Sequence, residues 1–249
     1  MAYTEQHVSS IHKWSEKTFS FTTTRPNDFR FENGEFVTLG LRHEGKLIAR
    51  AYSLVSTNDA DHLEFLSIHV PDGPLTSRLV NVREGDGVWI NSKATGSLTL
   101  NHVQPGRNLY MLSTGTGLAP FVSLVRDPEV YRRYEKVILV HTVRTREELA
   151  YKQQIETLTN DRFRYLPTVT REPFETTERG ADLFRSGALF SKLDIAPADP
   201  AHDRVMLCGN PHMIQEMTEY LEANDWAMTN YKGVGSFTVE KAFVLHNDD

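Results

Sequence analysis

The sequence has only one cysteine, Cys208, among its 249 residues. A single thiol cannot form an internal disulfide bond, a Cys-x-x-Cys pair or the cysteine ligand set of an iron–sulfur cluster. Any iron–sulfur centre that works with this chain therefore has to belong to a separate protein. No motif of a metal site is present either, so we expect no metal ion.

Long apolar runs and an excess of basic residues are also missing. No stretch approaches the roughly 20 apolar residues that a membrane-spanning helix needs. The first residues lack a basic segment followed by an apolar one, so we expect no secretory signal and a cytoplasmic location. The formal net charge is −6, which gives no support to nucleic-acid binding.

The first part of the chain, up to about Val103, has short apolar runs separated by Gly, Asn, Asp and Pro. This rhythm is typical of antiparallel strands in a small barrel or sandwich. Asn33-Gly34 predicts a hairpin turn. The candidate strands lie within residues 29–42, 46–56, 63–70, 86–92 and 96–100.

After Pro105, apolar strands alternate with amphipathic stretches. This alternation predicts a doubly wound parallel sheet. We therefore divide the chain into an antiparallel β-barrel domain, residues 1–103, and an α/β domain, residues 104–249. The expected strands of the second domain are 108–114, 136–143, 163–169, 204–210 and 236–244, and the expected helices are 119–127, 146–158 and 211–224.

A glycine-containing turn, Thr114-Gly115-Thr116-Gly117-Leu118-Ala119-Pro120, joins the first of these strands to a helix. Glycines let the backbone approach a pyrophosphate, and the free N–H groups of a helix start attract the anion. Pro120 suits the first helical turn. The third glycine of the usual dinucleotide fingerprint is missing, so an ordinary strand–helix connection remains an alternative.

The second strand of the α/β half runs into Arg144-Thr145-Arg146. Proteins that bind NAD place an acidic residue here for the ribose 2′-hydroxyl, whereas a guanidinium group pairs with a 2′-phosphate. The residues thus favour NADP(H) over NAD(H). Alternatively, both arginines are solvated charges at the start of a helix that Thr145 and Glu148 cap.

Five motifs in order carry a family resemblance. They are Arg50-Ala51-Tyr52-Ser53, Gly73-Pro74-Leu75-Thr76-Ser77, the glycine turn, Cys208-Gly209-Asn210-Pro211 and Val239-Glu240-Lys241-Ala242-Phe243-Val244. In this order they resemble the ferredoxin/flavodoxin–NADP reductases of the bacterial type, from about residue 8 to 244. The resemblance implies that the barrel binds FAD and that the α/β domain binds NADP(H), with the flavin between them.

On the FAD side, the resemblance implies that Arg50 binds the pyrophosphate, that Tyr52 stacks on the isoalloxazine ring and that Ser53 lies near flavin N5. The other residues that it places against FAD are Ala51, Ile68, His69, Val70, Leu75, Thr76, Thr116, Ala242 and Phe243.

On the nucleotide side, the resemblance places Thr114, Gly115, Gly117, Asn210 and Pro211 against NADP(H). Arginines after the second and third strands hold the 2′-phosphate in the family, here Arg144, Arg171 and a third, Arg179. The family pattern around the third is Gly-Arg-Ile-Thr, whereas this chain has Glu178-Arg179-Gly180-Ala181. This departure predicts a weaker hold on the 2′-phosphate.

The implied catalytic residues are Tyr52, Ser53, Cys208 and Glu240. Cys208 lies beside the nicotinamide in the family, although a small buried residue at a strand end is the alternative. Glu240 and Phe243 alternatively belong to a plain terminal strand. In family members with an Ala-Phe-Val tail, the tail covers the flavin face. Residues 245–249 lie beyond the matched part.

The implied reaction is hydride transfer from NADPH to FAD, followed by single-electron transfer to ferredoxin or flavodoxin, in a monomeric enzyme. Such acidic carriers predict a basic collar on the first domain, for which the candidates are Arg25, Arg30, Arg42, Lys46 and Arg78. Each of these is alternatively a solvated strand end. Other activities on this scaffold are free-flavin or oxygenase reduction and non-catalytic NADP(H) sensing.

Overall fold

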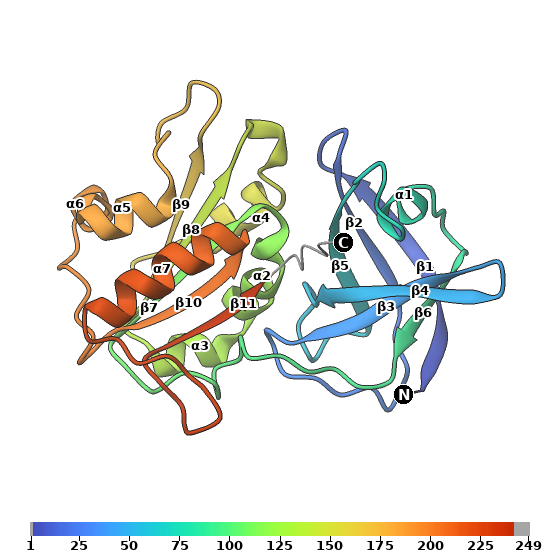
Figure 1. Cartoon of the computed structure of the whole chain (residues 1–249), viewed down its shortest axis with the longest axis horizontal. Helices are drawn as coiled ribbons and strands as arrows, with labels where there is room; N and C mark the ends of the chain where they lie inside the picture. The colour runs from blue at the N-terminus through green and yellow to red at the C-terminus, as the bar shows by residue number, and fades with distance from the viewer. Residues whose placement is uncertain (1, 242–249) are drawn as a thin grey trace.

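The computed structural model describes residues 2–241, which form two sheets with their own cores (Figure 1). The first sheet has the strand order β4-β3-β6-β1-β2-β5, and neighbouring strands in it are antiparallel. A bridge between Leu54 and Phe65 joins its two edges, so the sheet closes toward a barrel. Its strands are β1 (Tyr3–Lys13), β2 (Thr18–Thr24), β3 (Phe36–His43), β4 (Lys46–Ser53), β5 (His62–Ile68) and β6 (Gly87–Asn91), and the short helix α1 (Thr76–Leu79) follows β5.

The second sheet is parallel, with the order β11-β10-β7-β8-β9. Its strands are β7 (Asn108–Thr114), β8 (Lys136–Val143), β9 (Phe163–Val169), β10 (Arg204–Gly209) and β11 (Phe237–Lys241). The connections contain η1 (Gly115–Leu118), α2 (Ala119–Arg126), α3 (Pro128–Arg133), η2 (Arg146–Glu148), α4 (Lys152–Leu158), α5 (Gly180–Ser186), α6 (Ala188–Leu193) and α7 (Pro211–Ala223).

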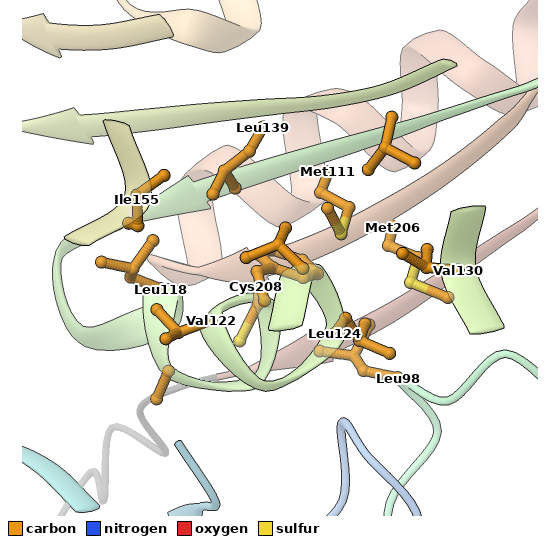
Figure 2. Close-up of a cluster of buried hydrophobic side chains, with 14 of the residues drawn as sticks. Leu98, Met111, Leu118, Val122, Leu124, Val130, Leu139, Ile155, Met206 and Cys208 are labelled. Atoms are coloured by element: carbon orange, nitrogen blue, oxygen red, sulfur yellow. The ribbon is translucent and has the colours of Figure 1, made fainter. Parts of the chain in front are cut away.

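Helices cover both faces of the parallel sheet. Side chains of α2, α3 and α4 pack on one face, and Figure 2 shows Val122 of α2 beside Cys208 and Leu124 of α2 toward Met206 of β10. Side chains of α5, α6 and α7 pack on the other face. The predicted doubly wound sheet and antiparallel barrel are therefore confirmed. The boundary after residue 103 stays a prediction, because the connection from β6 to β7 packs on the second core through Leu98 and Val103.

Several local expectations were wrong. Asn33-Gly34 forms a turn that precedes β3, whereas the hairpin turn between β3 and β4 is Glu44-Gly45, where both residues have positive φ. Residues 96–100 form no strand. Conversely, β1 and β2 were not expected, because β1 is largely exposed and β2 contains four threonines.

The helix expected over 146–158 also differs. Tyr151 has a left-handed backbone (φ 60°), so the helix proper begins only at Lys152. The Thr145 side chain caps nothing, and the Glu148 carboxylate instead accepts a hydrogen bond from the Arg144 backbone N–H (2.9 Å). The capping-box alternative is therefore wrong.

Buried hydrogen bonds fix α2 against the first sheet. The Asn33 amide donates to Asp127 (2.8 Å), and its oxygen accepts from the Asn58 N–H (2.7 Å) and from Ser123 (3.2 Å). The Ser123 hydroxyl, fully buried, lies within 3.0 Å of the Ser56 carbonyl oxygen. The contacts to Asp127 and Ser123 join residues more than 60 positions apart and thereby hold the two domains together.

A second contact lies beside the first. Glu64 of β5 pairs with Arg126 of α2 (3.3 Å) and accepts a hydrogen bond from the Tyr151 hydroxyl (2.8 Å). Trp14, between β1 and β2, lies against the Tyr151 ring at 4.6 Å between centroids. The sheets thus meet through polar and aromatic groups as well as through apolar ones.

The far end of the parallel sheet is held by an ion pair. Asp203 is fully buried and accepts two hydrogen bonds from the Arg107 guanidinium (3.1 and 2.8 Å) and two from backbone N–H groups. A buried carboxylate satisfied in this way joins the starts of β7 and β10.

The Asn33 contacts give a stability prediction. Replacing Asn33 by Ala removes three hydrogen bonds of a buried side chain, one of them to a carboxylate, so we expect a loss of about 3 kcal/mol in the free energy of unfolding. Asn81→Ala is the control, because Asn81 is exposed and bonds only one backbone carbonyl, and its expected loss is below about 0.5 kcal/mol. Equal losses in urea titrations of the two variants would contradict this account.

Candidate active site

A cavity of about 900 Å³ opens where the carboxyl ends of the parallel strands face the first sheet. In parallel α/β sheets, ligands bind at this edge. Thr18, Leu66 and Ile68 line it from the first sheet. Residues that follow β7, β8, β9 and β10 line the rest of the cavity, so both domains contribute to one site.

The glycine turn lies at the centre of this edge. Gly115 has φ +54°, which glycine adopts without strain, and a side chain on it would meet no protein atom within 4 Å. A side chain on Gly117 would instead come within 2.5 Å of the Cys208 carbonyl oxygen. The turn therefore presents bare backbone to the cavity and packs closely against β10.

Hydrogen bonds hold the turn from both neighbouring strands. On the β10 side, the Asn210 N–H donates to the Thr114 hydroxyl oxygen (2.7 Å). On the β8 side, the His141 Nε2 lies 3.0 Å from the Gly115 carbonyl oxygen. Burial lowers the pKa of His141 to about 4, so the ring is neutral and its Nε2 carries the proton. No sequence signal distinguished His141 from a core residue.

Three arginines line the cavity: Arg144, Arg171 and Arg179. The Arg171 N–H donates to the Arg144 carbonyl (2.9 Å), which places the first two side by side. Within residues 2–241 none of the three guanidinium groups forms an ion pair, whereas Arg146 bonds Glu172 and the Pro173 carbonyl. The three groups therefore suit a phosphate dianion.

Acidic residues also line the cavity, but most of them have cationic partners. Glu178 pairs with Lys192 (3.8 Å), and Asp182 and Glu216 both pair with Arg185. Glu148 bonds backbone, as described above. Three of these carboxylates thus pair with other cations, and the three arginines are left to pair with a ligand.

The motif Arg50–Ser53 lies at the end of β4, an edge strand of the first sheet. The Tyr52 hydroxyl lies 3.1 Å from the Ser67 hydroxyl, and its ring meets the Phe65 ring edge-on. Burial raises the pKa of Tyr52, so the phenol stays neutral. Arg50 and Ala51 are exposed, and the Arg50 guanidinium contacts only the Ala49 carbonyl among the described residues.

The turn that precedes α1 fits a phosphate. The Thr76 hydroxyl bonds the Val70 backbone (3.1 and 3.3 Å) and thereby closes the turn. The backbone N–H groups of Leu75 and Thr76 have no acceptor within residues 2–241. Leu75 itself is buried, so its contribution to a ligand is limited to the backbone. Free N–H groups in a turn are the donors that an anionic cofactor needs.

Ser53 and Glu240 meet where the two sheets adjoin. The Ser53 hydroxyl lies 3.4 Å from one Glu240 oxygen, and the Ser97 N–H lies 3.4 Å from the other. Burial raises the pKa of the Glu240 carboxyl to about 7. Cys208 lies opposite Glu240 in the β10–β11 register. Burial raises the pKa of its thiol, so it is not poised for acid–base chemistry.

The structure thus groups the expected residues in three places. Ile68, Thr114, Gly115, Thr116, Arg144, Arg171, Arg179 and Asn210 line the cavity. Pro211 begins α7 directly after Asn210, while His69 and Val70 continue from Ile68. Gly117 does not line the cavity, because it is buried against the Cys208 carbonyl. The remaining described residues lie at the α1 turn and around Ser53 and Glu240. Ala242 and Phe243 lie outside the described residues.

The described residues contain no group of His, Cys, Asp and Glu side chains that would hold a metal ion. Over the same residues, no helix is both long and apolar enough to cross a membrane.

Known proteins show the same division. Residues 6–98 match the oxidoreductase FAD-binding domain family, and residues 111–219 match the oxidoreductase NAD-binding domain family. The ferredoxin–NADP reductase of Azotobacter vinelandii is 47% identical over 96% of this chain and 97% of its own. That of Pseudomonas aeruginosa is 46% identical over 97% of this chain and 98% of its own.

A solved structure agrees with these relatives. A ferredoxin–NADP⁺ reductase from Neisseria gonorrhoeae with bound FAD and NADP superposes with a TM-score of 0.93 at 31% identity, covering 98% of this chain and all of that one. The expected fold, family and cofactors are therefore confirmed. The chain belongs to the ferredoxin–NADP reductase family and is an oxidoreductase with FAD-binding and NADP-binding domains.

Proposed function

We propose that this chain takes a hydride from NADPH onto FAD and passes electrons singly to ferredoxin or flavodoxin. The observation that carries this proposal is the cavity of about 900 Å³ that both domains line, where three arginines form no ion pair within residues 2–241. Bound FAD supplies the conversion of one hydride into two single electrons. The chain's own residues bind and orient the two nucleotides.

On the FAD side, Arg50 and the free N–H groups of Leu75 and Thr76 hold the pyrophosphate. Tyr52 offers a neutral, half-buried ring for stacking. Ser53 and Glu240 lie near the reacting atoms. The Ser53 hydroxyl and the protonated Glu240 carboxyl carry no negative charge there, so neither group repels the incoming hydride. These roles rest on the placement of the residues and on the family to which the chain belongs.

On the NADPH side, the glycine turn receives the pyrophosphate and Asn210 borders the nicotinamide path. Arg144, Arg171 and Arg179 hold the 2′-phosphate and thereby select NADPH over NADH. Cys208 is inert as an acid or base, and its place under the turn is compatible only with positioning the backbone.

We further propose that the electron carrier docks on basic groups of the first domain, in a monomeric and cytoplasmic enzyme. Arg42 lies over the Trp89 ring (4.2 Å) and, with Lys46, forms the basic end of the β3–β4 hairpin. Arg25 is different, because its guanidinium bonds three backbone carbonyls and serves the structure. Arg30 and Arg78 also contact carbonyls but stay near the surface.

The proposal predicts a yellow protein whose flavin absorbance is bleached anaerobically by NADPH much faster than by NADH. Stopped-flow absorbance with both nucleotides measures this preference. A colourless protein that cannot be reconstituted with FAD would contradict the reductase function, and reduced enzyme that transfers electrons to free flavin but not to ferredoxin or flavodoxin would contradict the carrier.

The arginine assignment predicts a cofactor-specific loss. In Arg144→Ala and Arg171→Ala we expect the KM for NADPH to rise about tenfold, since each variant removes charge-assisted hydrogen bonds to the 2′-phosphate. The KM for NADH should stay within about twofold. The control is Arg164→Ala, an exposed arginine of β9 outside the cavity. A parallel rise for both nucleotides would remove the assigned roles.

Glu240 gives a pH prediction. Its raised pKa, about 7, means that the carboxyl is neutral below this pH and ionised above it. A carboxylate beside the reacting atoms opposes the arrival of a hydride, so flavin reduction at saturating NADPH should slow as the pH rises through about 7. In Glu240→Gln the rate should lose this transition, whereas Glu222→Gln on the exposed face of α7 should keep it. An unchanged profile in Glu240→Gln excludes the role.

A further inference from the structure

Arg179 stands just before α5, where its backbone is extended (φ −67°, ψ 138°) and its side chain is exposed to the cavity. Its carbonyl accepts the N–H of Leu183 (3.0 Å), which ties it to the first turn of α5. The direction of this arginine is thus set by how the start of α5 is attached to the sheet.

The attachment is a hydrogen bond from the next residue. The Gly180 N–H donates to the Thr142 hydroxyl oxygen on β8 (3.0 Å). A Cβ atom at Gly180 would lie 2.6 Å from Val140 Cγ1 and 3.0 Å from that hydroxyl oxygen. Glycine therefore lets the start of α5 lie directly on β8, and this glycine is the residue that departs from the family pattern after Arg179.

The Thr142 hydroxyl is itself held in place. Its oxygen also accepts a hydrogen bond from the Thr168 hydroxyl of β9 (2.9 Å), and Thr168 is fully buried. Thr142 lines the cavity and lies two residues before Arg144, which directly follows β8. Strand β8 therefore leads directly into Arg144 and, through Thr142, anchors the segment that carries Arg179.

We propose that Thr142 is a positioning residue that, through the Gly180 N–H, holds Arg179 toward the 2′-phosphate and so contributes to the preference for NADPH. This inference rests on the proposed function, because it assigns a role within the same nucleotide site. The contact between Thr142 and Gly180 offsets the missing family flank, so that Arg179 is held relative to the sheet through the hydrogen bond of its neighbour Gly180.

The test uses the FAD-loaded full chain and two probes, adenosine 2′,5′-bisphosphate and 5′-AMP, which differ in the 2′-phosphate. Thr142→Val keeps the side-chain shape but removes the acceptor, and Thr142→Ser keeps the hydroxyl. By calorimetry, Thr142→Val should bind the bisphosphate about tenfold more weakly, since it leaves a buried N–H unsatisfied, with less than about twofold change for 5′-AMP. Thr142→Ser should restore most of the binding.

A double-mutant cycle separates positioning from general damage. Arg179→Ala should weaken bisphosphate binding. In that background, Thr142→Val should weaken binding by less than a further factor of about two, because the arginine that Thr142 positions is absent. Thermal unfolding midpoints of all variants show whether they are folded.

If Arg179→Ala weakens bisphosphate binding as expected, three results would overturn only the role of Thr142. They are unchanged bisphosphate affinity in Thr142→Val, an equal loss of affinity for both probes in that variant, and additive losses of affinity in the double variant. An Arg179→Ala variant that binds the bisphosphate like the wild type overturns the arginine assignment of the proposed function, and the role of Thr142 with it.

Discussion

The attachment of α2 to the first sheet determines where every other part of the site lies. The glycine turn leads directly into this helix, and the helix is fixed by Asn33, Ser56 and Glu64 of the other domain. Because one short helix carries both the turn and the interdomain contacts, the nucleotide-binding backbone is held at a set distance from the flavin-binding strands. Hydride transfer requires such fixed placement of two cofactors, since it depends on close approach of the reacting atoms.

The charged side chains of the site are also positioned by the packing of the strands and helices. The chain is acidic overall, yet Arg144 and Arg171 lie side by side because β8 and β9 run in register and the residues after them are hydrogen-bonded to each other. Arg179 joins them at the cavity from the start of α5, which is bonded to β8 through Gly180. The proposed preference of these arginines for NADPH also depends on two other cations, Lys192 and Arg185. Lys192 and Arg185 pair with the nearby carboxylates Glu178, Asp182 and Glu216, which leaves the three arginines without an acidic partner among residues 2–241.

Sequence patterns predicted the α/β half best, because buried parallel strands are continuous apolar runs with few alternatives. They missed β1, which is largely exposed, and β2, which contains four threonines. Asn33 looked like a turn residue because turn propensity is local, whereas its amide is used across the domain interface. His141 and Thr142 were missed for a related reason. Their importance lies in single hydrogen bonds to Gly115 and Gly180, and such bonds exist only after the strands and helices have packed.

The ion pair between Arg107 and the buried Asp203 lies at the opposite end of the parallel sheet from the cavity. This separation divides the sheet into an edge that secures the strands and an edge that meets ligands. The guanidinium groups of Arg144, Arg171 and Arg179 form no ion pair within residues 2–241, so these side chains can change with the cofactor while Asp203 keeps the strand starts aligned. The same scaffold can therefore acquire new substrate preferences by evolution without first losing its fold.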